Sequence, residues 1–390
     1  MVLIPLRYYI AMKIINLTLF FLVFFKPLIA IESIAKQAIV YDMQTNSIIY
    51  EKNADELMSP SSMSKLLTVY YVFKKLNNGE ISLTDKFKVS KKAWKKGGSK
   101  MFINENSLVS IEDLLRGIIV QSGNDACITI AEGFSGTEDN FADELNLLAK
   151  EIGLENSNFT NSTGWPDPEH LTTTRDLLKI AIRTINDFPE LYKYYAEKEF
   201  TYNKIRQINR NPLLFIDQNA DGLKTGHTSL GGYGLIASSK RLNRRIILIV
   251  NGLNSSKERK FESKKLMDAA FFQYKNISLD QKIISNENIF VWNGVKKKLK
   301  LYSKEDVNIT VPKLVANEIN FYIKYKSPVS APVEKDSEIG VILVKNKKGE
   351  ILKRFPLFAF ENINEMNFVK KIFFKFKYLI FGDSLYQTKK

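Results

Sequence analysis

The stretch that decides the fold is Ser59-Pro60-Ser61-Ser62-Met63-Ser64-Lys65. Its serines and proline are typical of a helix start, and residues 63–75 contain neither Gly nor Pro, so we expect a helix there. Ser62 and Lys65 are three residues apart and therefore share one helical face. A neutral lysine amine in that position can accept the hydroxyl proton and make Ser62 a nucleophile. The motif alone is weak, because Ser33 and Lys36 have the same spacing.

Two more short motifs follow along the chain. Ser122-Gly123-Asn124 lies between two expected helices, where its polar side chains can point into a cleft, although Asn124 can equally be a helix cap. Lys224-Thr225-Gly226 precedes an expected strand; it offers a cation, a hydroxyl for a carboxylate and a glycine that lets a substrate backbone approach. The alternative for this motif is a β-turn with an exposed lysine.

The pattern around these motifs indicates an α+β domain built on an antiparallel sheet. Turn residues separate two β-prone runs within 37–52, and Ser110 with Asp113 resembles a capping box. We expect helices over 110–119, 125–133, 176–185 and 263–272, a loop over 156–170, and strands over 233–238 and 245–251. From residue 278 the apolar residues alternate with polar ones, which predicts a small all-β domain over 278–360.

The first thirty residues have the order of an export signal. Basic Arg7 and Lys13 precede an apolar run, and a small residue, Ala30, ends the segment. An uncleaved N-terminal anchor is the alternative, and Met12 is a second candidate start. The net charge of +15 suits an anionic membrane or polymer, or merely a lysine-rich surface. One cysteine and two histidines exclude an intrachain disulfide and a His/Cys metal cluster, and we expect no metal.

The three motifs occur in a fixed order, at residues 62, 122 and 224. This trio is shared by penicillin-binding proteins and class A β-lactamases. The sequence resembles the D-alanyl-D-alanine carboxypeptidases among the low-molecular-mass penicillin-binding proteins. The resemblance extends to Asp125-Ala126-Cys127 after the second motif, to Asn209-Arg210-Asn211 and to His227-Thr228. It implies a β-lactamase/transpeptidase-like catalytic domain over 31–277, followed by the β domain.

The resemblance also implies roles for individual residues. Ser62 is acylated, Lys65 is its base, and Ser122, Asn124 and Lys224 line the cleft. Thr225, Arg210 and Arg245 bind the terminal carboxylate, with Arg244 as the neighbouring candidate, and the backbone N–H groups of Ser62 and His227 form the oxyanion hole; Gly226 belongs to the same substrate-binding set. Cys127 is expected to be a small buried residue, and His170 to order its loop.

The function that follows is removal of the terminal D-alanine from peptidoglycan stem peptides, with acylation by β-lactam antibiotics and without a cofactor. A β-lactamase, or an endopeptidase or transpeptidase of the same mechanism, remains an alternative. A catalytically silent wall-binding protein is another. No glutamate in the Pro-rich loop around Trp165 matches the deacylating residue of class A β-lactamases, so the deacylation assistant is unassigned. We expect no nucleic-acid partner.

The C-terminal segment 361–390 predicts an amphipathic helix. Seven apolar residues fall on one side of a helical wheel, and four lysines fall on the other with Phe374, Tyr378 and Phe381. Four lysines are too many for a transmembrane span, so a helix lying on the membrane surface fits better than a span. Packing into a core is the alternative. The sequence thus predicts an exported protein, peripheral on the periplasmic face of the cytoplasmic membrane.

Overall fold

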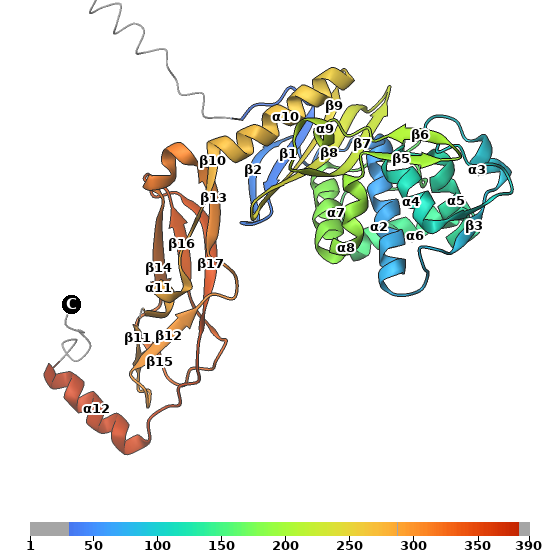
Figure 1. The fold of residues 1–390 in the computed structure, drawn as a ribbon. Coiled ribbons are helices and arrows are strands. Elements are labelled where there is room, and N and C mark those ends of the chain that lie inside the picture. Colours follow the sequence, from blue (N-terminus) through green and yellow to red (C-terminus); the bar gives the residue numbers. More distant parts are fainter. Residues whose placement is uncertain (1–30, 287, 382–390) are drawn as a thin grey trace, which may run out of the picture. The chain divides into compact units, whose positions relative to one another are not determined.

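The computed structural model describes residues 31–286 and 288–381. The expected signal segment 1–30 and the last nine residues of the expected tail lie outside the described residues. The N-terminal part of the fold contains a five-stranded antiparallel sheet with the strand order β2-β1-β9-β8-β7 (Figure 1). Its strands are β1 (Gln37–Asp42), β2 (Ser47–Lys52), β7 (Ala220–Thr228), β8 (Gly232–Arg241) and β9 (Arg244–Leu253).

Helices cover both faces of this sheet. Helix α10 (Ser256–Gln273) packs on β8 and β9, whereas α7 (Thr174–Asp187) packs on β1 and β9 from the side of the helical cluster (Figure 1). The cluster contains η1 (Ser61–Ser64), α2 (Lys65–Asn77), α4 (Ile111–Ile119), α5 (Asn124–Ser135) and α6 (Glu138–Glu151). Shorter elements complete it: β3 (Lys86–Lys88), α3 (Lys91–Lys95), β4 (Leu108–Ser110), α8 (Pro189–Tyr192), η2 (Lys193–Ala196), β5 (Glu199–Tyr202), β6 (Ile205–Ile208) and α9 (Leu213–Ile216).

Most of the expected elements are confirmed. The early hairpin forms as β1 and β2, and the Ser110 hydroxyl accepts a hydrogen bond from Asp113 N at the start of α4. Helix α10 begins seven residues earlier than expected, because Ser255 caps it by accepting a hydrogen bond from Glu258 N. The Lys-Thr-Gly motif lies inside strand β7 rather than in a turn. The turn alternative for that motif is therefore wrong.

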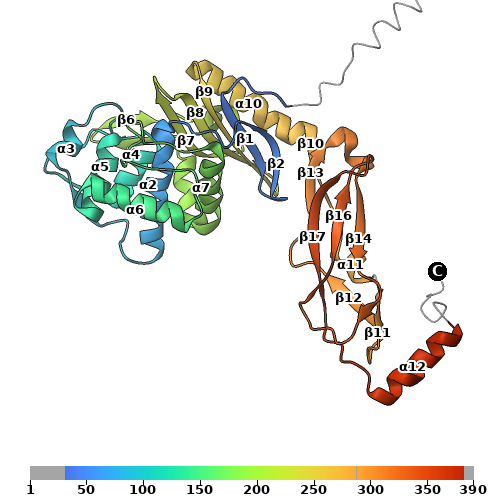
Figure 2. The same ribbon diagram turned by 180° about the vertical axis from the view of Figure 1, so that it is seen from behind.

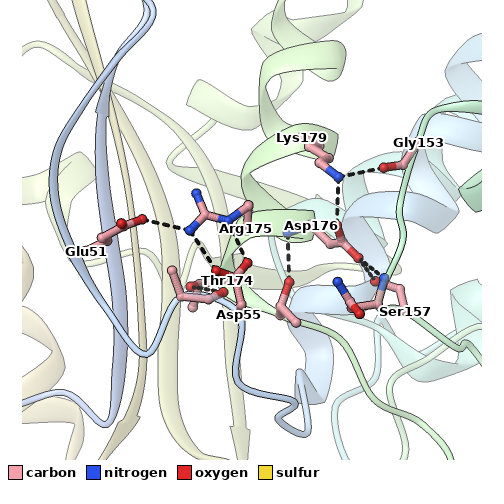
Figure 3. A network of polar contacts seen from close by, with 11 residues as sticks. Glu51, Asp55, Gly153, Ser157, Thr174, Arg175, Asp176 and Lys179 are labelled. Atoms are coloured by element: carbon pink, nitrogen blue, oxygen red, sulfur yellow. Dashed lines mark hydrogen bonds and ion pairs between the residues drawn. The ribbon is translucent and has the colours of Figure 1, made fainter. Parts of the chain in front are cut away.

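A polar network ties the start of α7 to two segments that lead into the helical cluster (Figure 3). Arg175 forms ion pairs with Asp55 and Glu51, just before η1. The neighbouring Asp176 is buried and accepts hydrogen bonds from Asn156 N and from the Ser157 hydroxyl, at the start of the expected loop. The first turn of α7 therefore fixes the segment before η1 and the start of the loop 156–170 relative to each other.

The chain continues into an all-β part, as expected (Figure 2). A six-stranded sheet has the order β14-β16-β17-β12-β11-β15, and β10 pairs with β13. Its core holds Val344, Phe355 and Leu357, which are fully buried. The elements are β10 (Tyr274–Ser278), α11 (Gln281–Asn286), β11 (Asn288–Trp292), β12 (Lys298–Tyr302), β13 (Asn308–Pro312), η3 (Lys313–Glu318), β14 (Asn320–Tyr325), β15 (Val329–Ser330), β16 (Glu338–Lys345) and β17 (Ile351–Ala359).

The last described element is helix α12 (Phe368–Phe381), which confirms the expected C-terminal helix. Phe374 is buried and packs edge-on against Trp292, as does Tyr378 one turn later. The opposite side exposes at least half of each of its apolar side chains: Phe368, Val369, Ile372, Phe373, Phe376, Leu379 and Ile380. Among the described residues, no helix has the length and apolar character needed to cross a membrane.

Candidate active site

The first feature of the site is the turn that carries Ser62. Residues 61–64 form a 3-10 helix, and Lys65 begins α2 directly after it. The spacing therefore brings the two side chains together, with Lys65 Nζ 2.8 Å from Ser62 Oγ. Lys65 Nζ also donates hydrogen bonds to Asn124 Oδ1, at 2.8 Å, and to the backbone carbonyl of Thr163.

The Lys65 amine is fully buried. Burial disfavours the charged form and lowers the pKa of Lys65 to about 8, with the charge of Arg210 acting in the same direction. Nearby Cys127 and Asp125 act in the opposite direction. A lysine with this pKa has an appreciable neutral fraction near neutral pH, which is the form that can accept a proton from Ser62.

The second and third motifs meet in the same place. Ser122 lies in the loop before α5 with a φ of 63°, a backbone conformation that non-glycine residues seldom adopt. Its hydroxyl accepts a hydrogen bond of 2.9 Å from Lys224 Nζ, which also donates to the Thr225 carbonyl. Burial and the nearby Lys65 charge hold the pKa of Lys224 well below its usual value. The cleft thus pairs two hydroxyls with two amines.

These groups open into a cleft of about 480 Å³. Its described lining contains two guanidinium groups and no carboxylate: Ser62, Gly98, Ser99, Ser122, Arg210, Thr225, Gly226, His227, Tyr233 and Arg259. Arg210 donates to the Ser99 hydroxyl, and His227 stacks on Tyr233 with 3.8 Å between the ring centroids. An excess of cationic donors suits an anionic group on the ligand.

Arg259, on the first turns of α10, is a cleft residue that the sequence motifs did not indicate. Its guanidinium lies over the Tyr233 ring, and its Nη1 is 3.4 Å from the Gly226 carbonyl. Partial burial lowers the pKa of Arg259 to about 10. Its buried Nε donates to no acceptor among the described residues. A buried donor without a partner is stabilised by an incoming anion. No local signal marks this residue, because it lies 33 positions beyond the Lys-Thr-Gly motif.

The structure places Arg245 differently from what the resemblance implied. Its guanidinium forms an ion pair with Asp221 and donates to Ser238, under the Tyr192 ring. The neighbouring Arg244 pairs with buried Asp42 instead. Both arginines of this pair therefore have intramolecular anionic partners, whereas the cleft is lined by Arg210 and Arg259.

The structure also shows what surrounds Gly226, Cys127 and His170. A Cβ at Gly226 would lie 2.7 Å from the Pro60 carbonyl and 3.0 Å from Met63, so the glycine lets β7 lie close to the Ser62 turn. The close approach is thus to the protein's own backbone. Cys127 is buried, and burial raises its pKa to about 12. His170 is buried as well; its Nδ1 accepts a hydrogen bond from Thr160 N within its loop.

A serine hydroxyl beside a buried amine, in a cleft with a second serine–lysine pair, defines a serine acyl-transfer site. Comparison with known proteins agrees. Residues 26–255 match the family model described as D-alanyl-D-alanine carboxypeptidase, and residues 271–365 match that of the penicillin-binding protein 5 C-terminal domain. The chain belongs to the D-alanyl-D-alanine carboxypeptidase family.

Individual relatives are similar over most of their length. The D-alanyl-D-alanine carboxypeptidase DacA of Haemophilus influenzae is 38% identical over 79% of this chain and 80% of its own. The carboxypeptidase DacF of Bacillus subtilis is 33% identical over 86% of this chain and 87% of its own. The crystal structure of penicillin-binding protein 5 from Haemophilus influenzae has a TM-score of 0.79 at 35% identity, covering 86% of this chain and 99% of that one.

The pKa of Lys65 predicts the pH dependence of acylation. Below a pKa of about 8 the amine is mostly protonated, so the rate constant for acylation by a β-lactam should rise with pH through this region and then level off. Stopped-flow measurement of adduct formation against pH tests this. Lys65→Arg is the control and should be inactive at every pH, because arginine stays charged. A rate constant that is flat or falls with pH would contradict the prediction.

Proposed function

We propose that this chain is an exported serine-type D-Ala-D-Ala carboxypeptidase, which removes the terminal D-alanine of peptidoglycan peptides through an acyl-enzyme on Ser62. The observation that carries the proposal is the 2.8 Å contact between Ser62 Oγ and a buried amine of lowered pKa. Family membership and carboxypeptidase relatives support the substrate class. Acylation by penicillins follows from the same chemistry, since a β-lactam presents an acyl group to the same serine.

The geometry suggests how Lys65 is oriented for its role. A neutral amine has two N–H groups and one lone pair. If the N–H groups point to Asn124 Oδ1 and the Thr163 carbonyl, the lone pair faces Ser62 Oγ. Ser62 then gives up its proton to Lys65 as it attacks the substrate carbonyl. The backbone N–H groups of Ser62 and His227 are the proposed donors to the oxyanion.

The second serine–lysine pair fits the next step. When the tetrahedral intermediate collapses, the departing D-alanine nitrogen needs a proton. Ser122 is the candidate donor, and Lys224, bonded to its hydroxyl, is the candidate source that restores that proton. Before water attacks, Lys65 passes on the proton that it took from Ser62, and Lys224, which has lost one, is the candidate acceptor. Lys65 is then a free base again; it takes a proton from the attacking water and returns one to Ser62 Oγ as the acyl group leaves. This sequence releases D-alanine and returns both hydroxyls to their starting state.

A carboxypeptidase must recognise the free carboxylate of the last residue. Arg210, Arg259 and the hydroxyl of Thr225 line the cleft and are the proposed binders. Arg259 has the stronger case of the two arginines, because its buried Nε–H has no acceptor within the part of the chain that the structure describes. A carboxylate reaching it would make a charge-assisted hydrogen bond. We therefore replace Arg245 with Arg259 in the proposed carboxylate site.

We further propose the domain limits 1–30 for the signal, 31–277 for the catalytic domain, 278–360 for the β domain and 361–390 for the tail. The tail is proposed as the membrane contact. Its helix buries Phe374 and leaves seven apolar side chains exposed along the other face. Such a stripe, with lysines beside it, suits the boundary between headgroups and acyl chains. The protein would then be peripheral on the outer face of the cytoplasmic membrane.

The nucleophile is tested by replacing Ser62. We expect Ser62→Ala to lose both D-alanine release and the covalent penicillin adduct seen by mass spectrometry, because no other hydroxyl contacts Lys65 Nζ among the described side chains. Ser33→Ala is the matched control, since Ser33 has the same spacing to a lysine, and it should label normally. An adduct on Ser62→Ala would refute the assignment, and an unlabelled native chain would favour the silent wall-binding alternative.

The carboxylate site is tested by exchanging Arg259 for glutamine, with the same exchange at Arg245 as the control. Arg259→Gln should lower kcat/KM about tenfold or more for a peptide with a free terminal carboxylate, since a hydrogen bond to a charged group is lost. The same peptide with an amidated terminus should be turned over slowly by both proteins. Arg245→Gln should instead leave this selectivity intact and lower stability, because Asp221 loses its partner. Equal turnover of free and amidated peptides by the native chain would favour an endopeptidase.

Membrane attachment is tested by ending the chain after Asn362. Each buried large apolar side chain contributes about 1.5–3 kcal/mol and each lysine near an anionic surface about 1 kcal/mol. The apolar stripe should therefore dominate, and high salt alone should not release the full-length mature protein from vesicles. The truncated protein should stay in solution and still hydrolyse small peptides. Sedimentation with anionic vesicles at low and high salt distinguishes these outcomes; a truncated form that sediments would place the anchor elsewhere.

A further inference from the structure

The loop that supplies the Thr163 carbonyl to Lys65 is held by a buried carboxylate outside the cleft. Glu138, the first residue of α6, accepts hydrogen bonds on Oε1 from the Ser162 hydroxyl, at 2.8 Å, and from Ser162 N, at 3.4 Å. The Glu138 side chain is 8% exposed, and its other oxygen lies 3.1 Å from Lys92 Nζ. Glu138 is not among the residues that line the cleft.

Ser162 is clamped from both sides. Glu138 accepts hydrogen bonds from the N–H and the hydroxyl of Ser162. The Ser162 carbonyl in turn accepts a 2.8 Å hydrogen bond from the Thr68 hydroxyl on α2, the helix that begins with Lys65. The next peptide carbonyl, that of Thr163, is the one that accepts from Lys65 Nζ. Since a peptide unit is planar, fixing the Ser162 carbonyl also fixes the Thr163 N–H, which donates to Asn161 Oδ1. Only the φ and ψ of Thr163 then separate this unit from the carbonyl that Lys65 contacts.

The loop also lies directly against the turn that carries Ser62. Gly164 has a φ of 72°, and a Cβ there would lie 2.0 Å from the Ser61 carbonyl, so the loop backbone touches the residue before Ser62. Within the loop itself, Asn161 Oδ1 accepts hydrogen bonds from the N–H groups of Thr163 and Trp165. The position of this loop therefore affects both the direction of the Lys65 lone pair and the packing of the turn that carries Ser62.

We propose that Glu138 is a positioning residue for catalysis, which orients the Lys65 amine through Ser162 and the Thr163 carbonyl. The inference rests on the proposed role of Lys65 as base. Glu138 lies at the first turn of α6, where the helix N-terminus favours negative charge, and one of its oxygens accepts from both Ser162 donors. Without it the loop carbonyl can turn away, and the amine loses one of the two acceptors that aim its lone pair at Ser62.

The test separates rate from binding in acylation of the full-length protein by a β-lactam. Glu138→Ala should lower the maximal acylation rate constant about tenfold or more, as expected for a misplaced catalytic group, with little change in the concentration giving half-maximal rate. Glu138→Gln keeps an oxygen acceptor and should restore the rate to within about twofold of native, while Ser162→Ala should fall between the two. Lys92→Met removes only the outer ion pair and should behave like the native protein.

Glu144→Ala is the matched control for a merely structural effect. Glu144 is a second carboxylate of α6 with hydroxyl partners, Tyr71 and Ser135, and both partners lie outside the loop. It should lower thermal stability without lowering the acylation rate constant of the folded protein. If Glu138→Ala acylates like the native protein, or if Glu144→Ala slows acylation equally, the inference is overturned. If the native protein itself forms no adduct, the failure lies with the proposed function instead.

Discussion

An amine can act as a base near neutral pH only if something keeps it uncharged, and here that constraint is the burial of Lys65. Desolvation by burial is the largest cause of its lowered pKa. Helix α5 and the loop over residues 161–165 each supply one hydrogen-bond acceptor to its Nζ, and the Ser62 hydroxyl is its third contact. A buried polar group without such partners would be costly, so the same three contacts stabilise the fold and define the reacting geometry.

The parts of the site that could be predicted are those set by local spacing. Ser62 and Lys65 meet because residues three apart share a helical face, and the 3-10 turn before α2 preserves that relation. Ser122 and Lys224 lie 102 positions apart, and only the resemblance to a known family indicated that they would meet. The helix start capped by Ser110 and the early hairpin were predicted from equally local signals, and both are present.

Long-range contacts explain what the sequence could not provide. Arg245 and Arg259 are both arginines near the third motif, and nothing in their neighbours distinguishes a structural from a ligand-facing guanidinium. The difference arises because Asp221, on β7, forms an ion pair with Arg245, whereas the buried Nε of Arg259 on α10 has no acceptor among the described residues. Glu138 was not anticipated either, since its partner Ser162 is 24 residues away and its effect on Lys65 passes through a backbone carbonyl.

The charges in and around the cleft affect which of the two lysines, Lys65 or Lys224, carries a proton. Burial and the charge of Lys65 lower the pKa of Lys224, so protonating both amines at once is unfavourable, and each amine is bonded to a different hydroxyl. In the proposed carboxylate site, a bound substrate carboxylate would partly offset this repulsion, because it would add negative charge beside Arg210 and Arg259. Lys224 then holds a proton more readily while the carboxylate is bound. A cleft without acidic residues in its described lining thus leaves this compensation to the substrate, which makes the free carboxylate part of the proton balance as well as of recognition.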